Sequence, residues 1–223
     1  MQLDYPLLRD LLLYASTAVF AVTGVLAAAR QNMDVMSFAI IGVVTAIGGG
    51  TLRDLMLDVP VFWLADPTWL FVAVGAALAT FFFERRFRAT HSAFLYLDAL
   101  GTAVFTVLAI EKAQALGAGP AVSVVMGVIT GIGGGIIRDL LTGQPTILMR
   151  RELYMTPLLL GGVLQVGLLQ AGLLTAAQAS MLAVAAMAFA RLGAIRWGWA
   201  FPDRLTYQPR APRPQDPGQG PTQ

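Results

Sequence analysis

Residues 153–190 form an apolar stretch without a single charged side chain. A helix needs about 20 largely apolar residues to cross a bilayer, so this stretch is too long for one span. It divides at "AGLLTAAQ", where Thr175 and Gln178 have the spacing of a capping box, which begins a helix. The stretch therefore predicts two consecutive membrane spans.

Shorter apolar runs predict five further spans. Only 13% of all residues are charged, against about 25% in soluble domains. We therefore predict an all-α membrane protein with seven transmembrane helices. The five additional runs cover residues 11–29, 35–52, 67–83, 92–110 and 113–137, and Asp98 is the one charge inside the fourth of them.

The basic residues predict how the chain is oriented. With seven spans, the face that carries the N-terminus holds only Arg9, Arg53 and Lys112 of the 15 Lys and Arg residues. Cytoplasmic loops are enriched in Lys and Arg, so we expect a cytoplasmic C-terminus, an external N-terminus and an inner-membrane location. The proline-rich tail, residues 199–223, is expected to be disordered in the cytoplasm. The opposite face receives Arg30, Arg85, Arg86, Arg88, Arg138, Arg150, Arg151 and the arginines of the tail.

One phrase occurs twice, 85 residues apart. "GVVTAIGGGTLRDLMLDVP" (42–60) aligns without a gap with "GVITGIGGGIIRDLLTGQP" (127–145) and is identical at 11 of 19 positions. Each copy belongs to a unit of three spans, so the second unit enters the membrane from the opposite side. We predict an inverted-topology repeat, with residues 1–92 as the first unit, 93–173 as the second and 174–198 as a seventh helix.

The glycine triplets of the two copies are expected to bend or unwind the second and fifth spans. Exposed backbone groups inside a membrane are tolerated only against protein or a water-filled cavity, so two such breaks predict a shared central path. An alternative is that the repeat is kept only for packing, because small residues let transmembrane helices approach closely. The triplets are Gly48, Gly49 and Gly50, and Gly133, Gly134 and Gly135.

Charged residues inside the spans are candidates for lining the path or for pairing. Ionisable residues within membrane spans are functional candidates by default, and they usually pair with another group. Helix counts place Asp98 at the depth of Arg138, and pairing between them is favoured. Adjacent residues on a helix do not face each other, so an Arg and the Asp beside it are expected to have different partners. The other candidates are Arg53, Asp54, Asp139 and Asp10, the last of which should lie near Arg53.

Hydroxyl side chains could add polar lining to the path. Thr17 and Thr45 have threonines at the equivalent positions of the second unit, which favours a shared cavity. Each hydroxyl could instead bond the carbonyl four residues earlier in its own helix. The candidates are Ser16, Thr17, Thr45, Thr102 and Thr130.

Enzymatic and nucleic-acid functions are not indicated. The chain has no cysteine, and its one histidine, His91, lies in an arginine-rich loop. No Walker A lysine follows the glycines, and they lack the spacing of a dinucleotide site. The arginines are dispersed rather than gathered in a basic stripe, which argues against a nucleic-acid partner. We expect no catalytic residue, cofactor or metal site.

With "PVFWL" (60–64) after its first copy, the doubled GGGxxRD pattern resembles the trimeric intracellular cation (TRIC) channels and their glycine-transporter-like bacterial relatives. The resemblance covers about residues 5–195. It implies a homotrimer in membrane lipid, with an ion path inside each protomer and helices two and five kinked at the glycines. It also implies passive conduction of monovalent cations, chiefly K⁺. Arginines stand where animal members carry a lysine motif for phosphoinositides, so the resemblance does not extend to that lipid.

Two other functions remain open from the sequence. A secondary transporter for glycine or another small solute could hold a substrate carboxylate at the N–H groups of a broken helix. A structural membrane protein without transport is the third possibility. No TVGYG filter is present, so sharp selectivity between K⁺ and Na⁺ is not expected.

Overall fold

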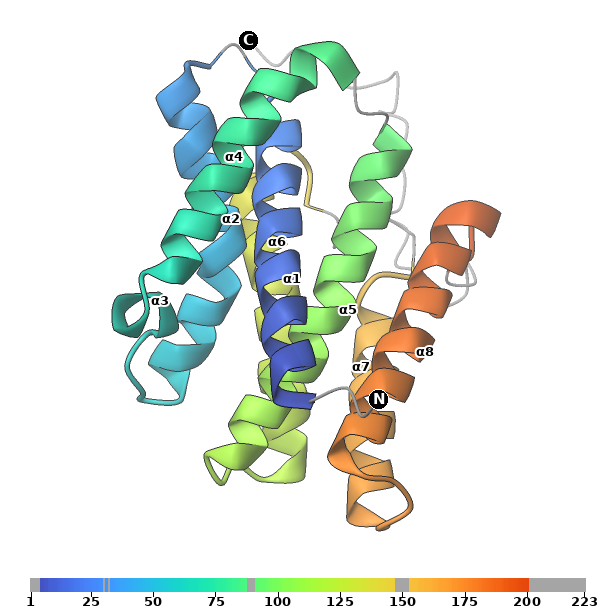
Figure 1. Cartoon of the computed structure of the whole chain (residues 1–223). Helices are drawn as coiled ribbons and strands as arrows, with labels where there is room; N and C mark the ends of the chain where they lie inside the picture. Colours follow the sequence, from blue (N-terminus) through green and yellow to red (C-terminus); the bar gives the residue numbers. More distant parts are fainter. Residues whose placement is uncertain (1–4, 30, 32, 88–90, 147–152, 201–223) are drawn as a thin grey trace, which may run out of the picture.

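A computed structural model describes residues 5–29, 31, 33–87, 91–146 and 153–200. All regular structure in this part of the chain is α-helical (Figure 1). The expectations for Arg30, Arg88, Arg150, Arg151, the side chains of Arg85, Arg86 and His91, and the tail beyond residue 200 lie outside what is described. The helices are α1 (Tyr5–Ala28), α2 (Val35–Met56), α3 (Phe62–Ala65), α4 (Thr68–Phe87), α5 (His91–Ala115), α6 (Pro120–Leu141), α7 (Met155–Gln170) and α8 (Ala176–Trp197).

Local sequence signals set the helix ends. The Asp34 carboxylate accepts a hydrogen bond from Ser37 N at 2.8 Å and caps α2. Pro120 occupies the first turn of α6, where its missing N–H costs nothing. The predicted capping box between Thr175 and Gln178 is present at the start of α8, and Gly198 ends that helix with φ +66°. The long uncharged stretch therefore divides where its sequence indicates.

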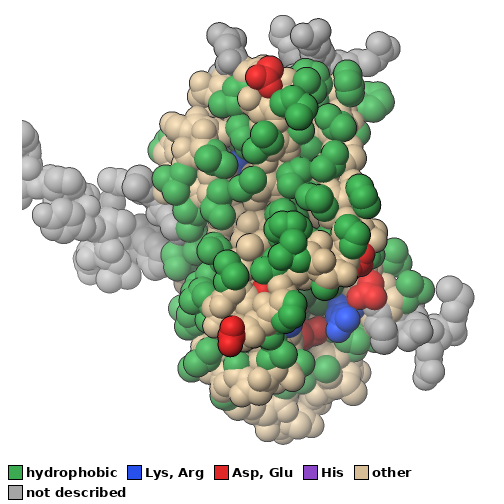
Figure 2. Space-filling model, turned by 90° about the vertical axis from the view of Figure 1, so that its left-hand side faces the viewer, with side chains coloured by type: hydrophobic (Ala, Val, Ile, Leu, Met, Phe, Trp, Pro, Cys, Tyr) green, Lys and Arg blue, Asp and Glu red, His purple; other side chains and the backbone are tan. Residues whose placement is uncertain are grey.

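Five helices of the described chain are long and apolar enough to cross a membrane: α1, α2, α5, α6 and α8. The apolar part of α4, Thr68–Phe83, and α7 are shorter, so the count of seven spans stays a prediction. The face in Figure 2 is covered mainly by hydrophobic side chains. Large apolar side chains such as Phe71 and Phe82 of α4 are 70% exposed, as expected for a surface that faces lipid.

The two glycine-bearing helices lie against each other within the bundle. α1 and α4 pack on α2, while α5 and α7 pack on α6, and α8 lies against α5 and α7. In Figure 1 α1 runs upward and α5 downward, and α2 and α6 likewise run in opposite directions. The buried polar side chains, such as those of Asp98 and Arg138, lie between these helices.

The glycine triplets do not unwind their helices. Residues 48–50 are helical throughout within α2, and residues 133–135 are helical throughout within α6. The expectation of an unwound segment is therefore wrong. Glycine lowers helix propensity by about 1 kcal/mol, but packing against neighbouring helices overrides this preference here. A bend of either helix axis remains a prediction.

Candidate functional site

One glycine from each triplet lies where α2 and α6 approach each other closely. A Cβ atom built on Gly49 would lie 2.2 Å from Thr130 O, and one built on Gly134 would lie 2.2 Å from Thr45 O. Neither position has room for a side chain. Gly49 and Gly134 are equivalent in the repeated phrase, as are Thr45 and Thr130, so the contact is reciprocal. Packing, the alternative explanation of the triplets, therefore accounts for these two glycines.

A narrow space lies at this crossing. It has no room for a water molecule. Its wall combines small residues with two aromatic rings, those of Phe20 and Phe105, whose centroids are 5.2 Å apart. The remaining lining residues are Thr45, Ala46, Gly49, Gly50, Thr130 and Gly134.

An open pocket of about 550 Å³ adjoins the narrow space. Gly50 of α2 and Phe105 of α5 line both, so the two spaces are adjacent. Charged groups of both signs line the pocket, and Figure 2 shows charged side chains where the surface is hollowed. Asp10 and Arg53, which were expected to lie near each other, both line this pocket. The ionisable lining residues are Tyr5, Arg9, Asp10, Arg53, Glu111 and Lys112.

Asp54 holds Arg53 and Lys112 in place on one side of the pocket. Its carboxylate is fully buried and accepts from Arg53 Nε at 2.8 Å and from Lys112 Nζ at 2.8 Å. It also accepts from the backbone N–H of Phe62 at 2.9 Å, which fixes the start of α3. Charged pairs buried in this way need additional hydrogen bonds, and Asp54 receives them. The Asp54 cluster (Arg53, Asp54 and Lys112) therefore joins α2 to α5 beside the pocket.

Glu111 links three helices at another part of the pocket wall. Its Oε1 accepts hydrogen bonds from Tyr5 of α1 and from Ser180 of α8. Burial, together with the hydrogen bond to Glu111, raises the pKa of Tyr5 to about 12. The phenol therefore stays protonated at neutral pH and donates to the carboxylate. Gln165 of α7 extends this hydrogen-bond network by donating to Ser180 Oγ at 3.0 Å.

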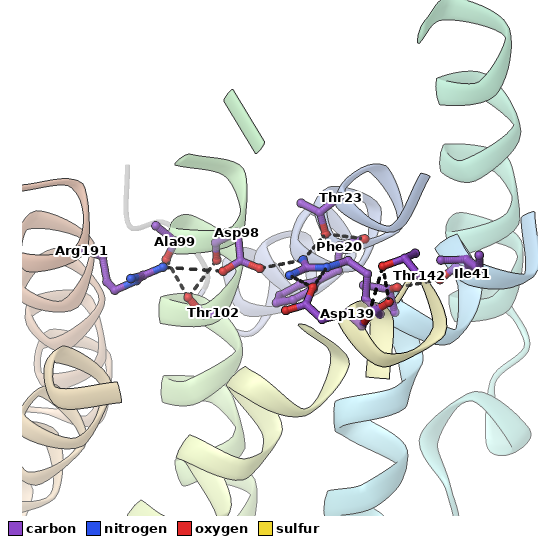
Figure 3. A network of polar contacts seen from close by, with 11 residues as sticks. Phe20, Thr23, Ile41, Asp98, Ala99, Thr102, Asp139, Thr142 and Arg191 are labelled. Atoms are coloured by element: carbon purple, nitrogen blue, oxygen red, sulfur yellow. Dashed lines mark hydrogen bonds and ion pairs between the residues drawn. The ribbon is translucent and has the colours of Figure 1, made fainter. Parts of the chain in front are cut away.

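A second group of charges lies beyond the glycine crossing. Arg138 Nη1 is 2.9 Å from Asp98 Oδ1, so the ion pair indicated by helix counts is present. The same nitrogen donates to Thr23 Oγ1 at 3.2 Å. Figure 3 shows Asp98 between Arg191 on one side and Thr23 and Asp139 on the other. We call Asp98, Arg138, Asp139 and Arg191 the Asp98 cluster.

The Asp98 cluster is closed to solvent. Asp98, Arg138 and Arg191 are fully buried, and Asp139 is 4% exposed. The guanidinium carbons of Arg138 and Arg191 lie 4.5 Å and 4.3 Å from the ring centroids of Phe94 and Tyr154. Such cation–π contacts are stronger when desolvated. Two arginines and two aspartates balance in charge, which makes their shared burial tolerable.

Neighbouring Arg and Asp residues do bond each other, contrary to expectation. Arg53 Nε donates to Asp54 Oδ1, and Arg138 Nε donates to Asp139 Oδ1 at 2.9 Å. The rule that adjacent helical residues do not face each other describes their Cβ directions. A guanidinium on a long, flexible stem turns back and reaches the carboxylate next to it. Asp10 pairs with Arg9 at 3.4 Å, and both side chains are about half exposed.

The threonines bond the backbone of their own helices. Thr17, Thr45, Thr102 and Thr130 donate to the carbonyls of Leu13, Ile41, Asp98 and Met126, each four residues earlier. This is the alternative considered from the sequence. Thr45 and Thr130 also line the narrow space, and Ser16 is 5% exposed. Their roles in a path remain predictions.

Sequence reasoning missed three charged participants. Arg191 received no role, although an arginine inside an apolar span is itself a signal of function. Lys112 served only to predict orientation, and Glu111 was not considered. Their partners come from other helices, and no pattern within the chain predicts those contacts.

Comparison with known proteins identifies the family. The profile of the glycine transporter family matches residues 10–85 and again 95–170. The inner membrane protein YadS of Escherichia coli K12, assigned to UPF0126, is 43% identical over 188 residues, which are 83% of this chain and 91% of YadS. A UPF0126 membrane protein of Vibrio cholerae is 40% identical over 83% of this chain and 78% of its own length.

Two solved cation channel structures have the same fold. The TRIC trimeric intracellular cation channel orthologue from Rhodobacter sphaeroides superposes with a TM-score of 0.82 at 39% identity, covering 86% of this chain and 99% of its own. A second TRIC cation channel structure, 27% identical, gives a TM-score of 0.81 over 91% of this chain and 98% of its own. The chain therefore belongs to the glycine transporter family, a TRIC-like group of multi-pass membrane proteins.

Proposed function

We propose that this protein is a channel for monovalent cations, chiefly K⁺. The match to TRIC cation channels supports a cation channel and suggests that the protein is not an enzyme. The observation that carries the proposal is the series of polar groups along α2 and α6. The 550 Å³ pocket adjoins the narrow space at the glycine crossing, and the buried Asp98 cluster lies beyond it.

Two related halves would enclose this path. We infer that residues 1–92 and 93–173 form inverted three-helix units, with residues 174–198 as an added seventh helix. The two matches of the family profile and the opposite directions of α1 and α5 support this division (Figure 1). The reciprocal contacts of Gly49 with Thr130 and of Gly134 with Thr45 fit a twofold axis between α2 and α6.

The described conformation corresponds to a closed channel. The narrow space between Phe20 and Phe105 does not admit water, so no hydrated ion passes it. At the other end, Arg138 occupies the cation position against Asp98. Conduction requires both the aromatic rings and the Arg138 guanidinium to move. Permeant cations could then be coordinated by carboxylate and hydroxyl oxygens, with hydroxyls of Thr45 and Thr130 in the wall.

A transporter for glycine or another small solute is the second candidate. The pocket combines Arg53 and Lys112, which could bind a carboxylate, with Asp10 and Glu111, which could bind an ammonium group. A zwitterion matches that combination. The family description as glycine transporters agrees with this possibility.

Recording from the purified protein in a planar bilayer distinguishes the two functions. We expect unitary current steps in a K⁺/Na⁺ gradient, with a reversal potential that indicates cation over anion permeation. Selectivity between the two cations should be modest, because the chain has no TVGYG sequence. Saturable uptake of labelled glycine without unitary steps would instead support the carrier and contradict the channel.

We further propose an inner-membrane homotrimer surrounded by lipid, with the N-terminus outside and the tail in the cytoplasm. The Rhodobacter relative is a trimeric channel, and the distribution of Arg and Lys favours this orientation. Fusions after Arg196 test it. Green fluorescent protein at this position should fluoresce and alkaline phosphatase should be inactive, whereas the reverse result would invert the topology.

A further inference from the structure

Arg191 is the one member of the Asp98 cluster that comes from α8. It lies outside both segments that match the family profile, residues 10–85 and 95–170. Its side chain is fully buried against the interior of the repeated helices. Arg191 Nη1 donates to Leu153 O at 3.2 Å, and the guanidinium lies over the ring of Tyr154. The side chain is therefore held in place on its other side, leaving its remaining nitrogens beside Asp98.

The hydrogen-bonding capacity between Arg191 and Asp98 is unused. Arg191 Nη2 is 3.7 Å from Asp98 Oδ2, which is an ion-pair distance but longer than a hydrogen bond. Among the described residues, Arg191 Nε, Arg191 Nη2 and Asp98 Oδ2 have no hydrogen-bond partner. Buried polar groups in this state are costly. A shift of less than about 1 Å would bring Nη2 and Oδ2 within hydrogen-bond range.

The charges of the cluster form a chain in the order Arg191, Asp98, Arg138, Asp139. The central link is Arg138 to Asp98 at 2.9 Å, and the outer link from Arg138 to Asp139 is also 2.9 Å. Breaking the central link divides the cluster into two neutral pairs. Arg138 keeps Asp139, which is adjacent on the same helix, and Asp98 keeps Arg191. No buried charge is left alone by this division.

We propose that Arg191 is a positioning residue that receives Asp98 when Arg138 withdraws to open the channel. The proposal rests on the proposed channel function, in which Arg138 closes the path. Without Arg191, the withdrawal of Arg138 would leave a buried carboxylate uncompensated, which is strongly unfavourable. α8 thus supplies the counterion that makes the open state accessible.

Single-channel recording of Arg191→Gln tests whether Asp98 pairs with Arg191 when the channel opens. We expect the open probability to fall by at least about tenfold, because Asp98 loses the arginine that would compensate its charge in the open state. Arg191→Lys retains the charge, and its open probability should stay close to that of the wild type. The exposed Arg196, on the same helix, provides the matched control Arg196→Gln.

A second measurement separates pairing of Arg191 with Asp98 from a general structural role of Arg191. In an Asp98→Asn background Arg191 has no carboxylate at residue 98 to pair with, so adding Arg191→Gln should leave the open probability unchanged. An equal decrease with and without Asp98 would overturn the proposal. So would a wild-type open probability in Arg191→Gln, or equal decreases in the Lys and Gln variants. Absence of unitary current in the wild type would instead contradict the channel function itself.

Discussion

Replacing Gly134 with alanine should lower the thermal unfolding midpoint of the purified protein, and Gly49→Ala should do the same. The new methyl group would lie 2.2 Å from a backbone carbonyl oxygen of the facing helix. Because a carbonyl in a helix cannot turn aside, α2 and α6 must separate. Overpacking of this kind typically costs about 1–3 kcal/mol. Circular dichroism of the detergent-solubilised variants during heating measures the change.

The same substitution at Gly75 of α4 is the matched control. A Cβ atom built there meets nothing within 4 Å. Alanine favours a helix by about 1 kcal/mol over glycine, so Gly75→Ala should leave the midpoint unchanged or raise it. Gly167→Ala in α7 should behave like Gly75→Ala, since that position is also open. If Gly134→Ala and Gly49→Ala melted like these controls, the close crossing of α2 and α6 would be wrong.

The repeated glycine phrase predicted that α2 and α6 meet, but not why. Its position in equivalent spans indicated a shared contact, and the structure has Gly49 and Gly134 there. The expectation of unwound backbone was wrong because it considered only helix propensity. The cost of glycine in a helix is offset by a helix–helix approach that no other residue permits. The distance between two packed helices could not be predicted from the sequence alone.

For the charged residues, the sequence predicted the depth of each side chain in the membrane but not the direction in which it points. Counting at 1.5 Å per residue placed Asp98 level with Arg138, and the two are paired. The count could not predict which way a flexible guanidinium turns, so the Arg138–Asp139 bond was missed. Arg191 was missed for another reason. It has no counterpart in the repeated units, and only the packing of α8 against α5 brings it to Asp98.

The Asp98–Arg138 pair should be among the most sensitive contacts in the protein. Asp98→Asn leaves Arg138 and Arg191 buried with Asp139 as the one remaining carboxylate of the cluster. Removing one partner of a buried ion pair costs about 3–5 kcal/mol, so a large drop in the unfolding midpoint is expected. Asp10→Asn is the control, because its pair with Arg9 is exposed at 3.4 Å and such pairs contribute about 1 kcal/mol or less.

The double variant Asp98→Asn with Arg138→Gln decides whether charge pairing is the cause. It removes one charge of each sign, leaving Arg191 and Asp139 to balance, and should therefore recover part of the stability lost in Asp98→Asn. A cluster stabilised only by the shape of its side chains would instead lose stability additively. The double variant also removes the Arg138 cation from the closed end of the path. We expect it to show a higher open probability than the wild type in bilayer recordings, and a more stable but permanently closed channel would mean that Arg138 does not block the path.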